Sequence, residues 1–94
     1  MYRIIDGRAT GKTCRLMCLA KDTGATIACM NPENMKRKAL NYGFVGINFV
    51  SYKDLLAVGG HRFDKVLIDE IELFIQYTIG VNGKLIGYSL SNEE

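Results

Sequence analysis

The sequence predicts an α/β domain of three layers, built on a mostly parallel sheet of about five strands. Short apolar runs alternate with segments that have helical spacing, which is typical of a parallel sheet with right-handed crossovers. The 94 residues are fewer than an average domain contains, so residues 1–94 are expected to form one unit. Hydrophobic residues make up 48% of the chain and charged residues 23%, a balance typical of folded proteins rather than disordered ones.

The first half of the chain is predicted to alternate strand, helix, strand and helix. Residues 2–6 form a short β-type run, and residues 25–30 form a second run that is apolar enough to be buried. A helix is expected between them over residues 12–22, with Gly24 as its stop. Another helix is expected after the capping residue Asn31, with a proline at its first position. The apolar residues assigned to the inner faces of these helices are Leu16, Met17, Leu19, Ala20, Met35, Ala39, Leu40 and Tyr42.

Two further strands are expected in the middle of the chain. Residues 47–50 form the third apolar run. Ser51, with Asp54 three residues later, resembles a capping box for a short helix. Residues 65–69 form the fourth run, and its continuous hydrophobicity suits a strand that is buried on both faces.

The end of the chain permits two arrangements. Residues 70–77 are predicted to be helical, and residues 84–90 are predicted to form a fifth strand of the sheet. Alternatively, Asn82 and Gly83 turn a two-residue hairpin that pairs the runs on either side of them.

Several classes of protein are excluded by composition. No apolar run approaches the roughly 20 residues that cross a bilayer, and the amino terminus lacks the apolar core of a signal peptide. Cys14 and Cys18 are four residues apart, which is not the C-x-x-C spacing of zinc or redox sites. We therefore interpret these two residues and Cys29 as buried, reduced thiols, and we expect a cytoplasmic protein without membrane contact.

The turn after the first predicted strand has the residues that a triphosphate site needs. Backbone N–H groups must surround the phosphates, a helix must begin there, a lysine must reach the β- and γ-phosphates, and a hydroxyl must help to hold Mg²⁺. Gly11, Lys12 and Thr13 supply these groups in order. Asp6 stands where the usual pattern has glycine, and a glycine-rich turn with a solvated Lys12 is the structural alternative. The expected phosphate-binding residues are Gly7, Arg8, Ala9, Thr10, Gly11, Lys12, Thr13 and Cys14.

Two carboxylates follow the fourth predicted strand. Asp69 and Glu70 stand at its carboxyl end, the edge at which open α/β sheets bind ligands. Solvated acids at the end of a buried strand are the structural alternative. Together with the Gly11-Lys12-Thr13 sequence, this arrangement favours a nucleotide site at one edge of the sheet.

These two segments resemble the Walker motifs of P-loop NTPases. Residues 8–13 are similar to the R-x-x-G-K-T variant of Walker A in phage terminase large subunits, and residues 66–70 resemble their Walker B motif with its catalytic glutamate. The chain thus resembles a minimal domain of the additional-strand, catalytic-glutamate division and small stand-alone P-loop proteins of phages. Ser89 and Ser91 stand where the coupling motif of that division would fall.

The resemblance implies Mg-ATP as ligand. It places Lys12 on the phosphates as a catalytic residue, Thr13 and Asp69 on Mg²⁺, and Glu70 on the attacking water as the catalytic base, with Arg8 near the γ-phosphate. The implied function is ATP binding with slow hydrolysis, in a phage or mobile-element protein linked to DNA transactions in the host cytoplasm. Members of that division usually take an arginine finger from a second lobe or a neighbour, and because we expect neither within these 94 residues, an isolated copy should hydrolyse ATP slowly.

Other functions and partners are also consistent with the sequence. A homo-oligomer or a larger motor protein could supply the missing arginine. Arg62 is a candidate for that arginine, although we favour plain surface charge for it. A non-hydrolysing regulatory module that acts on a larger protein is the competing function, and a small nucleotide kinase fits less well because no lid segment follows residue 70. Residues 36–38 form the only basic run, which is either a nucleic-acid contact or a solvated helix face. The aromatic residues assigned to packing rather than to base stacking are Tyr42, Phe44, Phe49 and Tyr52.

Overall fold

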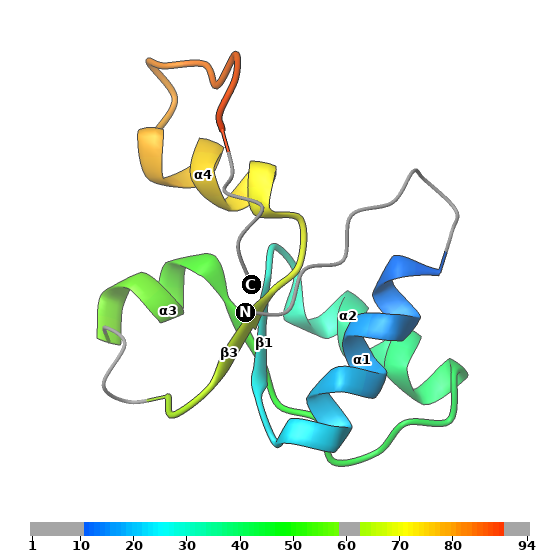
Figure 1. Cartoon of the computed structure of the whole chain (residues 1–94). Coiled ribbons are helices and arrows are strands. Elements are labelled where there is room, and N and C mark those ends of the chain that lie inside the picture. The colour runs from blue at the N-terminus through cyan, green and yellow to red at the C-terminus, as the bar shows by residue number, and fades with distance from the viewer. Residues whose placement is uncertain (1–10, 59–62, 90–94) are drawn as a thin grey trace.

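A computed structural model describes residues 11–58 and 63–89 of the chain. Helices and strands alternate along these residues (Figure 1). The elements are α1 (Lys12–Thr23), β1 (Thr26–Cys29), α2 (Pro32–Asn41), β2 (Phe49–Ser51), α3 (Tyr52–Val58), β3 (Val66–Ile68) and α4 (Ile71–Ile79). The predicted α/β class is therefore confirmed for the described part of the chain.

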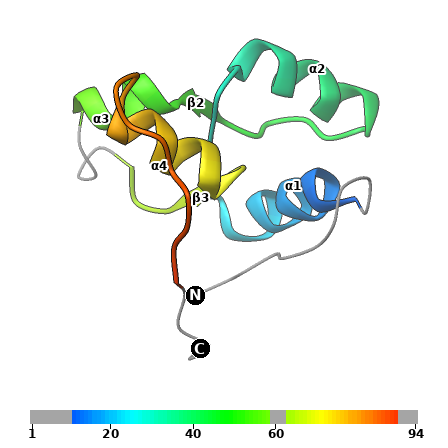
Figure 2. The same ribbon diagram turned by 90° about the horizontal axis from the view of Figure 1, so that it is seen from above.

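The strands form a parallel sheet in the order β2-β1-β3. In the central strand β1, Ile27 lies opposite Phe49 of β2 and Leu67 of β3, and these three residues contact the cluster formed with α1 and α2. The next residue, Ala28, joins the cluster formed with α3 and α4. Figure 2 shows α1 and α2 on one side of the sheet and α3 and α4 on the other, so the described residues form three layers.

The expectation of about five strands is wrong for the described residues, which form three. The first expected strand, residues 2–6, lies outside them. Residues 84–89 are described and form neither a strand nor one arm of a hairpin. The carboxamide of Gln76 explains this, because it bonds to the carbonyl groups of Gly80 and Gly83 and accepts the N–H of Leu85 at 2.6 Å. These backbone groups bond to α4 instead of to a neighbouring strand.

A small residue is required at position 83, where the chain after α4 folds back against this helix; residues 83–89 are called the C-terminal arm. A Cβ atom at Gly83 would overlap the Cγ2 atom of Ile79, whose branched side chain has little room to move. We expect Gly83→Ala to destabilise the packing of the arm by about 1–3 kcal/mol. Hydrogen exchange at the Leu85 amide, measured by NMR, should then become faster. Gly87→Ala is the matched control because a Cβ there has no atom within 4 Å, and it should leave this exchange rate unchanged.

Local signals position the ends of the helices as predicted. Gly24 ends α1 in a left-handed conformation with φ 76°. The side chain of Asn31 accepts the N–H of Asn34 at the start of α2. The hydroxyl of Ser51 accepts the N–H of Asp54 at the start of α3, which confirms the predicted cap.

Several predictions about inner faces are wrong. Leu40 and Tyr42 are exposed, because Met35 and Ala39 occupy the inner stripe of α2 and Leu40 lies about 100° further round the helix. Among the cysteines only Cys29 is buried, whereas Cys14 is half-buried and Cys18 is exposed. Within the described ranges, none of the helices combines the length and the apolarity that crossing a membrane requires.

Candidate nucleotide site

The order of the strands creates a place for a ligand at their carboxyl ends. The chain leaves β1 for β2 on one side and then returns to place β3 on the other side of β1. Open α/β sheets bind ligands beyond the carboxyl ends of their strands at such a reversal. Met30 and Asn31 follow β1 at this edge, and Asp69 and Glu70 follow β3.

The first turn of α1 is suited to an anion. Gly11 precedes it with φ 80° and ψ 21°, a left-handed conformation that glycine adopts without strain. The Gly11 carbonyl accepts the N–H of Arg15, and no described side chain caps the amide groups of this end. The turn contains Lys12 and Arg15 but no acidic residue. Its positive charges add to the positive end of the helix dipole, so an anion would be stabilised there.

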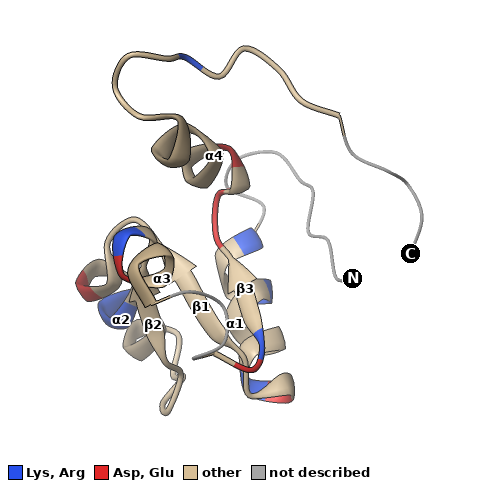
Figure 3. Ribbon diagram, turned by 90° about the vertical axis from the view of Figure 1, so that its left-hand side faces the viewer, with Lys and Arg blue, Asp and Glu red and all other residues tan. Residues whose placement is uncertain are grey.

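Asp69 interacts electrostatically with this turn. Burial and the adjacent Glu70 carboxylate raise the pKa of Asp69, while the ammonium groups of Lys38 and Lys12 lower it. Alternation along β3 agrees with this, because Leu67, two residues earlier, faces α1 and α2. Figure 3 shows the acidic turn after β3 and the basic start of α1 at the same end of the sheet. The pKa of Asp69 is raised overall, because burial and Glu70 outweigh the two ammonium groups.

Glu70 has an unusual backbone conformation. With φ 57° and ψ 71° it is the only described residue other than glycine that has a positive φ. Its carbonyl accepts the N–H of Phe74 and so begins α4. A left-handed conformation costs an ordinary residue roughly 1–2 kcal/mol. Such strain is typical of functional sites, and here it lies at one of the two predicted acids.

Tyr52 completes this edge of the sheet, although its sequence context predicts only packing. The sequence assigned it to packing, and its side chain is indeed buried, but its hydroxyl also bonds to the carbonyl of Asp69. Burial, followed by the charges of Asp69, Cys29 and Glu70, raises the pKa of Tyr52 to about 12. Burial and the charge of Asp69 likewise raise the pKa of Cys29 to about 11. Its position in the sequence could have indicated this role, because Tyr52 directly follows β2 and so lies at the carboxyl edge of the sheet.

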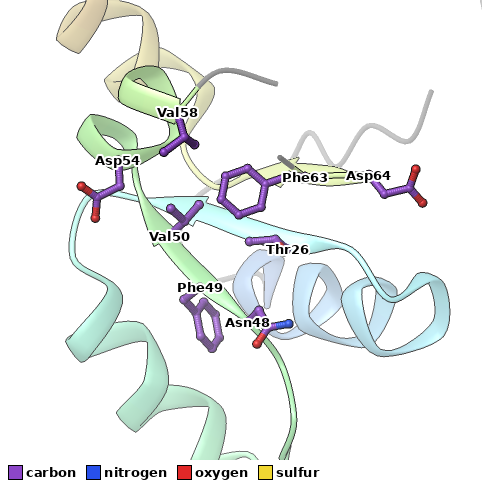
Figure 4. A pocket seen from close by; sticks show the side chains of 8 residues that line it. All are labelled: Thr26, Asn48, Phe49, Val50, Asp54, Val58, Phe63 and Asp64. Carbon is purple, nitrogen blue, oxygen red and sulfur yellow. The ribbon is translucent and has the colours of Figure 1, made fainter. Parts of the chain in front are cut away.

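A separate hollow of about 610 Å³ lies beneath α3 (Figure 4). Thr26, Asn48 and Phe63 lie at or before the amino ends of the strands, at the edge opposite Asp69. Asp54 and Asp64 give the hollow a negative lining that would repel a triphosphate. It is therefore distinct from the predicted nucleotide site.

The basic run, residues 36–38, lies on α2. Lys36 lies 3.9 Å from Glu33 on the same helix, whereas the charge of Lys38 acts on Asp69. All three residues of the run are exposed. The run is thus a solvent-exposed helix face, and only its Lys36 is paired along the helix in the described residues.

The oxygen ligands expected for Mg²⁺ fit the residues present. Thr13, half-buried in the first turn of α1, and Asp69 offer a hydroxyl and a carboxylate, the ligand types that Mg²⁺ takes together with phosphate oxygens and water. Groups of three or more His, Cys, Asp or Glu side chains are absent from the described residues. The predicted site residues 7–10 lie outside those residues, as do Arg62 and Ser91. No protein-family model, curated protein or solved structure matches this chain.

Proposed function

We propose that the chain binds Mg-ATP at the carboxyl edge of the sheet, between the start of α1 and the turn after β3. The observation that carries the proposal is geometric: the basic start of α1 and the acidic turn after β3 lie at the same end of the sheet (Figure 3), although they are far apart in the sequence. Residues 7–14 would surround the phosphates with backbone amides, and Lys12 would contact the β- and γ-phosphates.

The charges at this edge support a bound metal ion. Asp69 and Glu70 are adjacent carboxylates, and the charge of Glu70 disfavours the ionised form of Asp69. A divalent cation at Asp69 would relieve this repulsion and would also neutralise part of the phosphate charge. We assign Thr13 and Asp69 as the Mg²⁺ ligands.

The arrangement also supports slow hydrolysis. Glu70 is exposed directly after Asp69, where its carboxylate could orient a water molecule and accept its proton. An arginine finger is worth roughly 10³–10⁵ in rate, and a second copy or a larger motor protein could supply it. The proposed setting is a phage or mobile-element protein of the host cytoplasm, connected with DNA transactions and with Lys36, Arg37 and Lys38 as its basic contact. The competing proposal is a module that binds ATP without turnover and regulates a larger protein.

Glu70→Gln separates these two proposals. The substitution removes the base but keeps the shape of the side chain, so Mg-ATP affinity by titration calorimetry should stay within about twofold, while phosphate release should fall at least about 100-fold. Glu72→Gln, two residues along the chain in the first turn of α4, is the matched control and should release phosphate at the wild-type rate.

The outcomes for the wild-type protein are equally informative. Binding of Mg-ATP without detectable phosphate release, with or without DNA, would favour the regulatory module. The absence of binding heat between wild type and Mg-ATP would contradict the proposed site. If wild type releases phosphate, equal release by the two glutamine variants would contradict the role of Glu70 as the base.

A further inference from the structure

We infer that Tyr52 is the positioning residue that holds the Asp69–Glu70 turn, and with it the two carboxylates, in place for metal and water. The inference rests on the proposed function, but its effect on the turn can be measured without nucleotide. Its basis is the hydroxyl of buried Tyr52, which donates a hydrogen bond to the backbone of the strained acidic turn. Tyr52 and the turn belong to different parts of the chain.

The buried hydroxyl of Tyr52 bonds to the backbone of the acidic turn. The residue is 1% exposed, at the start of α3. Its oxygen lies 2.5 Å from the carbonyl oxygen of Asp69 and 3.3 Å from that of Glu70. The bond is partly buried, and a buried tyrosine hydroxyl that loses its acceptor is left unsatisfied, so the bond to Asp69 is costly to break.

Ring contacts hold the hydroxyl in this position. The Tyr52 ring packs edge-on against Phe74, with the ring centres 5.2 Å apart, and lies 6.1 Å from the ring of Tyr77. Both partners belong to α4, the helix that the turn begins. The same side chain therefore contacts the turn through its hydroxyl and the following helix through its ring.

The remaining backbone bonds leave the turn little freedom. The N–H of Asp69 donates to Ala28 of β1 at 2.9 Å, and the carbonyl of Glu70 accepts from Phe74 at 3.1 Å. Tyr52 supplies the missing restraint between them, at the Asp69 carbonyl. With the peptide group between the two acids fixed, Glu70 is held in its left-handed conformation.

The direction of the restraint also matters. Tyr52 belongs to the cluster on the α3 and α4 side of the sheet, whereas Leu67, two residues before Asp69, faces the α1 and α2 side, and alternation along the strand gives Asp69 the same side. Holding the backbone from one side leaves the carboxylate on the other, where the Mg²⁺ of the proposed site would lie.

Tyr52→Phe tests the inference, with Tyr77→Phe as the matched control because it makes the same chemical change on a neighbouring ring. We expect Tyr52→Phe to raise the Mg²⁺ concentration needed for half-maximal ATP binding by about tenfold, as the loss of a group that orients a metal ligand does. ATP binding in EDTA should be unchanged. Tyr77→Phe should leave both values unchanged, and a loss of packing alone would lower the melting temperature without moving the Mg²⁺ dependence.

The second readout uses no nucleotide. In ¹H–¹⁵N NMR spectra, Tyr52→Phe should shift the amide signals of residues 69–71 and change the HN–Hα coupling of Glu70, whereas Tyr77→Phe should not. Unchanged signals there would overturn the inference. If wild type fails to bind Mg-ATP, the proposed function falls, while the Glu70 coupling still decides whether Tyr52 holds the turn.

A folding rescue covers the case in which Tyr52→Phe is unstable. Glycine adopts the left-handed conformation without restraint, so the double variant Tyr52→Phe/Glu70→Gly should recover most of the lost stability. An additive loss in the double variant would contradict a link between Tyr52 and the conformation of Glu70.

Discussion

Replacing Lys12 with alanine is expected to weaken the binding of Mg-ATP by on the order of 100-fold, because a charge-assisted contact to phosphate is worth about 1.5–3 kcal/mol and each 1.4 kcal/mol changes affinity tenfold. Lys12 is the lysine at the start of α1 whose charge also acts on Asp69. Titration calorimetry with Mg-ATP measures the effect directly.

The control for this prediction is Lys53→Ala. Lys53 is an exposed lysine of α3, a helix on the opposite face of the sheet from α1, so the change in net charge is the same but its position is remote. The affinity of the Lys53→Ala protein for Mg-ATP should stay within about twofold of wild type, because solvent ions screen a charge that is far from the site. Equal affinities for all three proteins would exclude α1 as the phosphate site.

Replacing Glu70 with glycine is expected to give a more stable protein than replacing it with alanine, by about 1–2 kcal/mol. Both variants lack the carboxylate, so they differ only in how well residue 70 tolerates φ 57°. Alanine has a Cβ that crowds the backbone in this conformation, and glycine does not. Denaturant unfolding, followed by circular dichroism, gives the difference.

The same pair of substitutions at Glu72 should give the opposite order. Glu72 lies in the first turn of α4 with ordinary helical geometry, where alanine is favoured over glycine by about 1 kcal/mol. Finding the alanine variant more stable at both positions would mean that the turn after β3 relaxes at no cost. Both variants at residue 70 should also lose phosphate release, so any gain in stability accompanies a loss of the proposed activity.

The parts of the fold that could be predicted depend on neighbouring residues. The cap at Asn31 and the stop at Gly24 act within one turn of their own helices. The strand at residues 66–68 could be predicted from its continuous apolar run, because a strand covered by helices on both faces has no polar side. The expectation that Lys12 and Asp69 form one site rests on a different rule, that open parallel sheets bind ligands at their carboxyl edge, and it stays a prediction.

The parts that could not be predicted depend on contacts between distant segments. Residues 84–89 have the composition of a strand, but the carboxamide of Gln76 takes their backbone groups. The hydroxyl of Tyr52 reaches the Asp69 carbonyl across 17 positions of the chain. Neither partner leaves a periodic pattern in the sequence, because a single polar contact changes no hydrophobic spacing.

The central position of β1 has a consequence for how the protein is made. Both neighbours of β1 come later in the chain, and β3 comes much later than β2. As the nascent chain leaves the ribosome, one edge of β1 stays unpaired until residues 66–68 have emerged. An open apolar edge is a template for pairing with other chains, so the pause before β3 appears is the interval in which newly made molecules are most exposed to aggregation.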